Sequence, residues 1–347
     1  MNNKLIVTLP VTLLCSFMLY SCGSSVDSTD TTNSTAALAG NWSFHSLRSG
    51  VSPRWRYGND QIDANGNATR INITRSSNNQ DIGEAYTLSV DTNNTILKSG
   101  VDTYHGTLSN DDLIVNTRSR NSGSAYRLQF LQKQSDNYSL SDLQGDWHFH
   151  TLSSGSTNDW RHGEEQIDAS GNVTRVSVVN SDNSVIVGGD YTLGIDAQGN
   201  ITRTDVASYH GSISDDKTLM INTRSKESGT TFRIKILQKK GGSFTTADLA
   251  GTWVFHNLVS GAGASWTYGV DTIDANGIVI NTSRFNNSGD TTTRAGIQTL
   301  TLDANGVIRR SDSPSYHGVM SADKNYMIVT TDAGAGAYRL KVFQRRN

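Results

Sequence analysis

The sequence predicts an all-β protein built from three tandem copies of one antiparallel unit. Gly is plentiful, with 32 of 347 residues, Pro is scarce, with 3, and Ser, Thr, Asn and Asp crowd the spaces between short apolar runs. This composition is typical of many short strands joined by tight turns. One series of motifs also occurs three times, at a spacing of about 105 residues. The chain is long enough for each copy to have its own core.

The first 21 residues are typical of a signal peptide. An apolar run from Leu5 to Tyr20 is short for a membrane-spanning helix. It ends in Leu-Tyr-Ser-Cys at residues 19–22, which resembles the lipobox of bacterial lipoproteins. The resemblance implies that residues 1–21 are removed and that Cys22 is lipidated; a soluble secreted protein is the alternative. Gly23 stands where an Asp signals inner-membrane retention in enteric lipoproteins, so the resemblance implies the outer membrane.

Residues 22–36 form a polar stretch with little to bury, which predicts a flexible tether. The other cysteine, Cys15, lies inside the signal peptide. The mature chain is therefore expected to have no disulfide, although an exported compartment would permit one.

Each copy contains the same motifs in the same order. The first is Gly-x-Trp-x-Phe-His, which begins at Gly40, Gly145 and Gly251, and a second Trp follows the first by thirteen positions. A Tyr-His-Gly motif comes later, and an apolar run closes the copy. These motifs place the repeats at residues 37–134, 139–240 and 245–347. We expect each repeat to fold by itself, since a unit of about 100 residues buries roughly two-thirds of its unfolded surface.

Turn motifs divide each copy into strands. Asp-Ala-x-Gly occurs at residues 63–66, 196–199 and 303–306, between runs of strand-like residues. Asp begins such a turn by accepting hydrogen bonds from nearby backbone, and Gly takes the position with positive φ. A further hairpin is expected around residues 111–112, 215–216 and 323–324. The count is about eight strands a copy, which can close into a meander barrel without exposed edges.

The repeat resembles the calycins, the superfamily of lipocalins and avidins. Their first strand carries a Gly-x-Trp motif, and this motif occurs here three times, with Trp42, Trp147 and Trp253 as its last residue. Their last strand carries a cation that packs over this Trp, and the resemblance assigns that role to Arg127, Arg233 and Arg339. One feature departs from the family: Arg127 alternates with Tyr126 and Leu128, so it points away from the face that those two would bury.

A six-bladed β-propeller with two blades per repeat is the alternative architecture. Tyr268-Gly269 before the turn at 274–277 loosely resembles Tyr316-His317-Gly318 before the turn at 323–325, as half-repeats would. The propeller requires the middle Asp-Ala-x-Gly turn to link an outer blade strand to the next inner one. A tight hairpin cannot make that crossing, so barrels are favoured.

Aromatic and histidine residues that recur in all copies are the candidates for ligand binding. An aromatic lining with a few polar tips can hold a small apolar ligand or stack on a sugar ring. The candidates are Trp55, Trp160, Trp266, Tyr104, Tyr209, Tyr316, His105, His210 and His317. The alternative for all of them is core packing, and for the histidines a hydrogen bond to a neighbouring strand. The second Trp of each copy is favoured for binding, because its polar neighbours indicate a barrel rim.

The sequence predicts no metal site, no cofactor and no enzyme. Each copy offers two recurring His and no Cys, too few for three or four converging ligands. The common catalytic motifs are missing. A net charge of −2 with interspersed signs gives no stripe for nucleic acid.

Two functions follow from these observations. The favoured one is a lipid-anchored binding protein of the cell envelope, whose three barrels present repeated sites to a small apolar ligand, a glycan or a protein partner. The other is a purely structural surface lipoprotein, in which the recurring residues serve folding alone.

Overall fold

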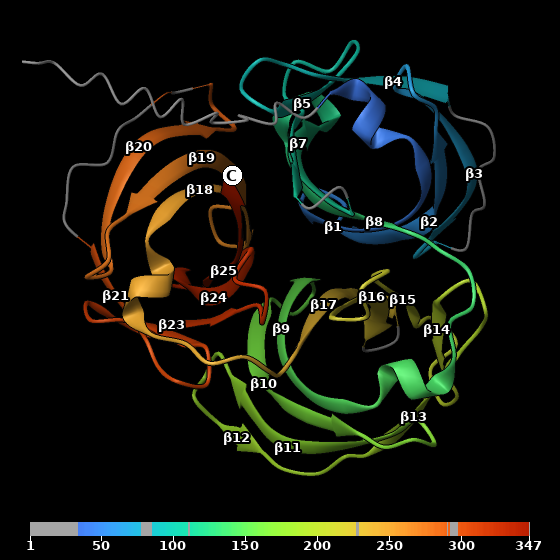
Figure 1. Cartoon of the computed structure of the whole chain (residues 1–347), viewed down its shortest axis with the longest axis vertical. Coiled ribbons are helices and arrows are strands. Elements are labelled where there is room, and N and C mark those ends of the chain that lie inside the picture. The colour runs from blue at the N-terminus through green and yellow to red at the C-terminus, as the bar shows by residue number, and fades with distance from the viewer. Residues whose placement is uncertain are drawn as a thin grey trace, which may run out of the picture. The chain divides into compact units, whose positions relative to one another are not determined.

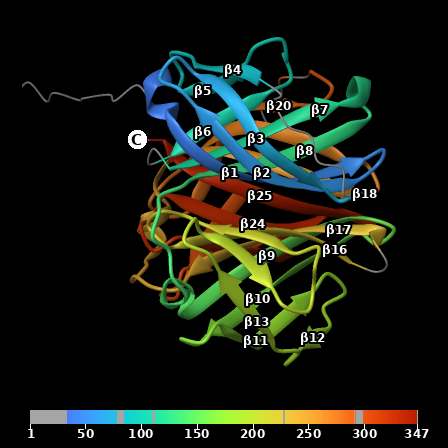
Figure 2. The same ribbon diagram turned by 90° about the vertical axis from the view of Figure 1, so that its right-hand side faces the viewer.

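Each of the three copies forms a closed antiparallel barrel (Figure 1). The computed structural model describes residues 34–77, 85–109, 112–226, 229–289, 291 and 298–346. The signal peptide, the lipobox and most of the tether lie outside these residues. In each barrel eight strands follow one another in chain order, and the last strand pairs with the first. Figure 2 shows the paired strands β1, β2 and β8 of the first barrel from the side.

The strands of barrel 1 are β1 (Gly40–Gly50), β2 (Arg54–Ile62), β3 (Asn67–Arg75), β4 (Ala85–Val90), β5 (Thr95–Lys98), β6 (His105–Ser109), β7 (Leu113–Arg120) and β8 (Ala125–Lys133). Those of barrel 2 are β9 (Gly145–Gly155), β10 (Asp159–Ile167), β11 (Asn172–Asn180), β13 (Tyr191–Ile195), β14 (Asn200–Arg203), β15 (His210–Ile213), β16 (Leu219–Lys226) and β17 (Thr231–Lys239). A two-residue strand, β12 (Val185–Ile186), pairs with β11 beside the ring.

The strands of barrel 3 are β18 (Gly251–Gly261), β19 (Ser265–Ile273), β20 (Ile278–Asn286), β21 (Gln298–Leu302), β22 (Val307–Arg310), β23 (Ser313–Met320), β24 (Tyr326–Gly334) and β25 (Ala337–Arg346). Short 3₁₀ helices are η1 (Thr35–Leu38), η2 (Asn121–Gly123), η3 (Leu140–Leu143) and η5 (Thr246–Leu249). No helix among the described residues has the length and apolar character needed to cross a membrane.

The predicted eight-stranded barrels are confirmed, and the propeller is wrong. A propeller needs separate four-stranded blades, whereas the pairing of β1 with β8 closes one ring within a single repeat. The Asp-Ala-x-Gly segments form the predicted turns. Asp63 Oδ1 accepts hydrogen bonds from the backbone N–H groups of Asn65 and Asn67, and Gly66 has φ +79°. A Cβ at Gly66 would lie 2.0 Å from the carbonyl oxygen of Leu88, so only Gly fits there.

Both faces of the first strand of each barrel are buried. Trp42 and Phe44 belong to the core inside barrel 1, whereas Leu47 belongs to a different cluster. That second cluster contains residues from all three copies, so it lies between the barrels on their outer faces. Its members include Leu47, Leu128, Leu152, Ile234, Leu258 and Leu340. The three barrels thus share one apolar core in addition to their own, and all three belong to a single unit of the chain.

This shared core bears on the expectation that each repeat folds by itself. Each barrel closes its own sheet, but its outer apolar residues are buried only by the other two barrels. A separate repeat would expose these residues to water, and this exposure would cost about 25 cal/mol of folding free energy for each Å² of apolar surface.

Candidate functional site

Three junctions join the barrels in a cyclic order. His45 of barrel 1 contacts Ser212 Oγ through Nε2 at 3.0 Å and Thr223 Oγ1 through Nδ1 at 3.3 Å, both in barrel 2. His256 of barrel 3 makes the same two contacts, at the same distances, with Thr107 and Thr117 of barrel 1. At the remaining junction His150 of barrel 2 contacts His317 of barrel 3, with 3.0 Å between Nε2 and Nδ1. Each barrel therefore contacts both of the others.

The second Trp of each copy lies in these junctions. Trp55 donates its indole N–H to Ser225 Oγ at 2.8 Å, Trp266 donates to Ser119 Oγ at 2.8 Å, and Trp160 donates to Asp332 Oδ1 at 2.7 Å. Each Trp is at most 1% exposed, and each acceptor belongs to the next barrel. The second Trp was predicted to lie at a barrel rim because its neighbours in the sequence are polar. Since residues alternate along a strand, those neighbours lie on the opposite face from the Trp: Trp55 faces outward, and Arg54 and Arg56 face into barrel 1.

The histidines of the Tyr-His-Gly motifs also lie in the junctions, where each stacks on a ring of another barrel. His210 stacks on Tyr57 with 5.1 Å between ring centroids, His105 on Tyr268 at 5.1 Å, and His317 on His162 at 3.5 Å. The Tyr of each motif lies in a barrel core instead. Six of the nine ligand candidates are thus placed between barrels, and Tyr104, Tyr209 and Tyr316 inside them.

The first Trp of each copy packs inside its barrel beneath a short helix. Trp42 donates its indole N–H to the carbonyl oxygen of Leu38 at 2.9 Å, and Trp147 and Trp253 make the equivalent bonds at 2.9 Å. The cations over these rings are Lys133 at 5.7 Å, Lys239 at 5.5 Å and Arg345 at 4.3 Å from the ring centroid.

The assignment of Arg127, Arg233 and Arg339 to that role is wrong. Strand register pairs Trp42 with Lys133 and Arg127 with Arg48, six residues away along β1. Leu128 lies in the core between barrels, so Arg127, its neighbour, points into barrel 1. The predicted alternation of Arg127 with Leu128 is correct, but the face that Leu128 buries is the outer one.

The barrel interiors are lined by cations. A cavity of about 40 Å³ in barrel 2 is lined by Glu165, Tyr191 and Tyr209 together with Arg161, Arg175, Arg203, Arg224, Arg233 and Lys235. A cavity of about 50 Å³ in barrel 3 is lined by Asp271, Tyr316 and the cations Arg284, Arg310, Arg339 and Lys341. These volumes suit a few water molecules or a small oxyanion. Ordinary pockets for organic ligands measure roughly 300–1,000 Å³.

Each interior also contains a buried acid at an equivalent position of its second strand, held by a cation or a tyrosine. Asp60 accepts from Arg70 Nε at 3.0 Å, Glu165 from Tyr191 at 2.9 Å, and Asp271 pairs with Lys341 Nζ at 3.0 Å. A β-bulge adjoins each acid in its strand. Burial lowers the pKa of Lys235 and of Lys341 to about 8, although Glu165 and Asp271 oppose this shift.

Sequence reasoning missed these cations. The signal was present in repeat 1, where Arg48, Arg54, Arg56 and Arg75 alternate with apolar or neutral residues on three successive strands. Taken alone, each looks like a solvated surface residue. In the described part of the chain no group of three His, Cys, Asp or Glu side chains could hold a metal ion.

No protein-family model and no curated protein matches the chain. Among solved structures, a protein of unknown function from the DUF3598 family of Nostoc punctiforme is 9% identical, with a TM-score of 0.23 over 60% of this chain and 99% of that one. Isotype 1 transferrin binding protein B of serogroup B Neisseria meningitidis is 10% identical, with a TM-score of 0.28 over 88% of this chain and 76% of that one. A mutant of the Haemophilus parasuis protein of the same name is 7% identical, with a TM-score of 0.29 over the same shares. Likenesses this weak carry no weight for function.

Proposed function

We propose that this chain is a lipid-anchored binding protein of the cell envelope whose ligand is a small anion, held in the cation-lined barrels. The observation that carries this proposal is the excess of arginine and lysine over acids inside the barrels, in the cavity linings of barrels 2 and 3 and at the inward-facing positions of barrel 1. Buried cations need opposite charge nearby, and planar guanidinium groups suit oxygen anions. The proposal replaces an apolar ligand with an anionic one, because these cavities are too small and too polar for the former.

The anchor in this proposal is Cys22. In cells that make the full chain, Cys22→Ala should move the protein from the membrane fraction to the soluble fraction. The wild type should stay with the outer membrane when the two membranes are separated on a density gradient. A Cys22→Ala chain that remains equally membrane-bound would remove the lipid anchor from the proposal.

Anion binding is tested with the purified full-length protein in detergent. Inorganic phosphate and sulfate, titrated at low ionic strength, should raise the melting temperature in a saturable way, because a ligand bound only by the folded state stabilises it. Sodium chloride at equal ionic strength is the control for general screening.

A purely structural role is the second candidate, favoured by the junctions, which contain six of the nine ligand candidates. It predicts equal melting temperatures in phosphate, sulfate and chloride. Equal values would thus exclude the anion-binding proposal.

A further inference from the structure

The far end of barrel 1, which lies away from the short helix η1 over Trp42, carries more positive charge than the equivalent end of the other barrels. Six inward positions on five strands are arginine: Arg48, Arg54, Arg56, Arg75, Arg118 and Arg127. Strand register pairs Arg48 with both Arg54 and Arg127, Arg118 with Arg127, and Arg56 with Arg75. Residues directly opposite each other in paired strands share a face, so all six side chains point into the barrel.

The same positions in the other repeats are far less charged. Repeat 2 has three arginines and one aspartate there, and repeat 3 has one arginine. The decisive position is Arg54, which corresponds to Asp159 in repeat 2 and to Ser265 in repeat 3.

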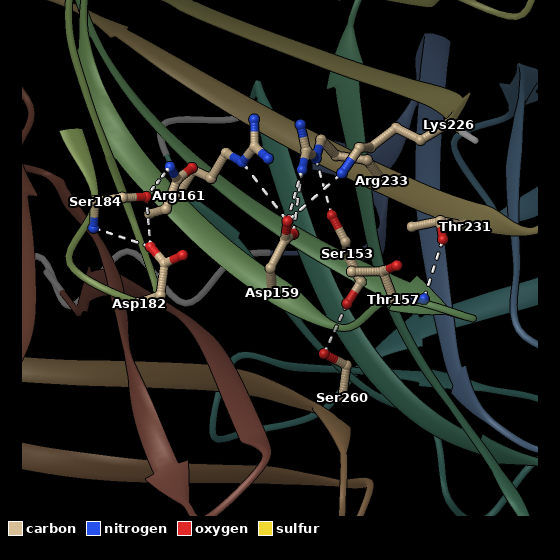
Figure 3. A network of polar contacts seen from close by, with 11 residues as sticks. Ser153, Thr157, Asp159, Arg161, Asp182, Ser184, Lys226, Thr231, Arg233 and Ser260 are labelled. Carbon is tan, nitrogen blue, oxygen red and sulfur yellow. Dashed lines mark hydrogen bonds and ion pairs between the residues drawn. The ribbon is translucent and has the colours of Figure 1, made fainter. Parts of the chain in front are cut away.

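In repeat 2 the aspartate neutralises the cluster. Figure 3 shows Asp159 between Arg161, Arg233 and Lys226. Both carboxylate oxygens of Asp159 lie 3.1 Å from Arg233 Nη2, and Arg233 Nε also donates to Ser153 Oγ at 2.9 Å. Burial opposes the ionisation of Asp159, but Arg233 and its neighbours lower its pKa to about 2. Repeat 2 therefore carries its own counter-charge.

Repeat 1 replaces that counter-charge with a further cation. Arg127 is 2% exposed, and its Nε and Nη2 have no hydrogen-bond partner among the described residues; Arg118, 4% exposed, has none there at Nε and Nη1. Asp60, deeper in the barrel, is already bound by Arg70 and Tyr86. Burial, followed by the neighbouring Arg118 and Arg56, lowers the pKa of Arg127 well below its usual value. Guanidinium groups nevertheless keep their proton in proteins, so Arg118 and Arg127 remain charged without a paired carboxylate among the described residues.

We infer that the far end of barrel 1 binds one phosphate or sulfate group, free or as the ester of a small molecule, between Arg54, Arg118 and Arg127. A tetrahedral oxyanion offers acceptors to several guanidinium groups at once, whereas one carboxylate satisfies only one or two. Arg54 and Arg75 are half-buried, whereas Arg56, Arg118 and Arg127 are buried. The cluster is thus graded from an accessible rim to a buried floor. This inference rests on the proposed function and assigns it to one repeat.

The test is isothermal titration calorimetry on the full-length protein with inorganic phosphate, inorganic sulfate and glucose 1-phosphate. One anion should bind per chain. Arg54→Asp, which supplies the carboxylate that repeat 2 carries, should weaken binding at least tenfold without unfolding the protein, because Arg54 is half-buried. Ser265→Asp makes the matched change in repeat 3 and should leave the affinity within twofold of the wild type. Arg118→Gln should also weaken binding about tenfold.

The outcomes separate this inference from the proposed function. Three anions per chain, or unchanged affinity in Arg54→Asp, would leave anion binding in place and overturn the assignment to repeat 1. An absence of binding by any of the three anions would overturn both. Vesicles of phosphatidylglycerol in phosphatidylcholine distinguish the source of the phosphate when the chain also carries Cys22→Ala, which removes the proposed lipid anchor. Sedimentation of this chain that Arg54→Asp abolishes supports a lipid headgroup in this site. Sedimentation that Arg54→Asp leaves unchanged, without binding of the soluble anions, overturns the inference.

Discussion

At the scale of single residues, the buried acids inside the barrels are each held by a partner. Lys341 of barrel 3 lies with Nζ 3.0 Å from Asp271 and 3.8 Å from the ring centroid of Phe255. The Asp271 side chain is 4% exposed and that of Lys341 is 18% exposed. Such a pair adds little net stability, but either partner alone is a buried charge without compensation. The pairs thus constrain which residues each barrel tolerates.

Lys341→Met is therefore expected to lower the free energy of unfolding by about 3–5 kcal/mol, because it leaves Asp271 buried without its cation. Adding Asp271→Asn should restore most of the loss. Urea denaturation of the wild type and both variants measures this. Equal stability of wild type and Lys341→Met would contradict the pairing.

At the scale of the strand, both faces of the elements that join the barrels are buried. Two features of the strand faces could be predicted from the sequence: Trp42 and Phe44 share one face, and Arg127 and Leu128 lie on opposite faces. The turns that begin at Asp63, Asp196 and Asp303 could be predicted as well. Alternation says that a strand has two faces, but not which of them faces the barrel interior. The rim position predicted for Trp55 is wrong for this reason. Trp55 lies on the outward face of its strand, which a second barrel covers, and contacts between copies leave no periodic pattern in the sequence.

Histidines in the junctions make stability depend on pH. Burial, with a smaller effect of His210 on His45 and of His105 on His256, lowers the pKa of His45 and His256 to about 3. The unfolded chain, with its histidine pKa near 6.5, binds more protons between pH 6.5 and 3. The stability from each neutral histidine is therefore complete above pH 6.5 and is lost as pH falls, by about 1.4 kcal/mol per pH unit.

His45→Gln, which keeps a neutral hydrogen-bonding group, should flatten the fall in the free energy of unfolding between pH 6 and pH 4, measured in urea. Asp112 makes the free energy of unfolding change with pH in the opposite direction, in the wild type and in the variant alike. Burial and the nearby Asp216 and Asp323 raise its pKa to about 7. The comparison with the wild type cancels that effect. Parallel pH profiles for the two proteins would count against a buried neutral His45.

At the scale of the whole molecule, the cyclic junctions and the shared core pack three closed barrels against one another. Repetition in the sequence predicted the number of barrels. It could not predict their mutual dependence, because Leu152, Ile234 and similar residues look the same whether they fill a barrel or cover a neighbouring one.

Calorimetric unfolding of the full chain should accordingly show one main transition for all three barrels, with calorimetric and van't Hoff enthalpies in agreement. Residues 139–240 made alone should aggregate or remain unfolded, since the separate copy exposes its outer apolar residues. Three resolved transitions, or a soluble and folded single copy, would contradict this dependence.

Our proposal is that the second Trp of each copy and the junction histidines hold the barrels together, while the interior cations bind an anion. The affinity for inorganic phosphate, measured by calorimetry in Trp160→Phe and Arg118→Gln beside the wild type, tests it most directly. Trp160→Phe removes a buried hydrogen bond to Asp332 and should cost about 1–3 kcal/mol of stability while leaving the affinity unchanged. Arg118→Gln should weaken binding about tenfold without lowering the melting temperature. Loss of phosphate binding in Trp160→Phe, with full binding in Arg118→Gln, would contradict the account.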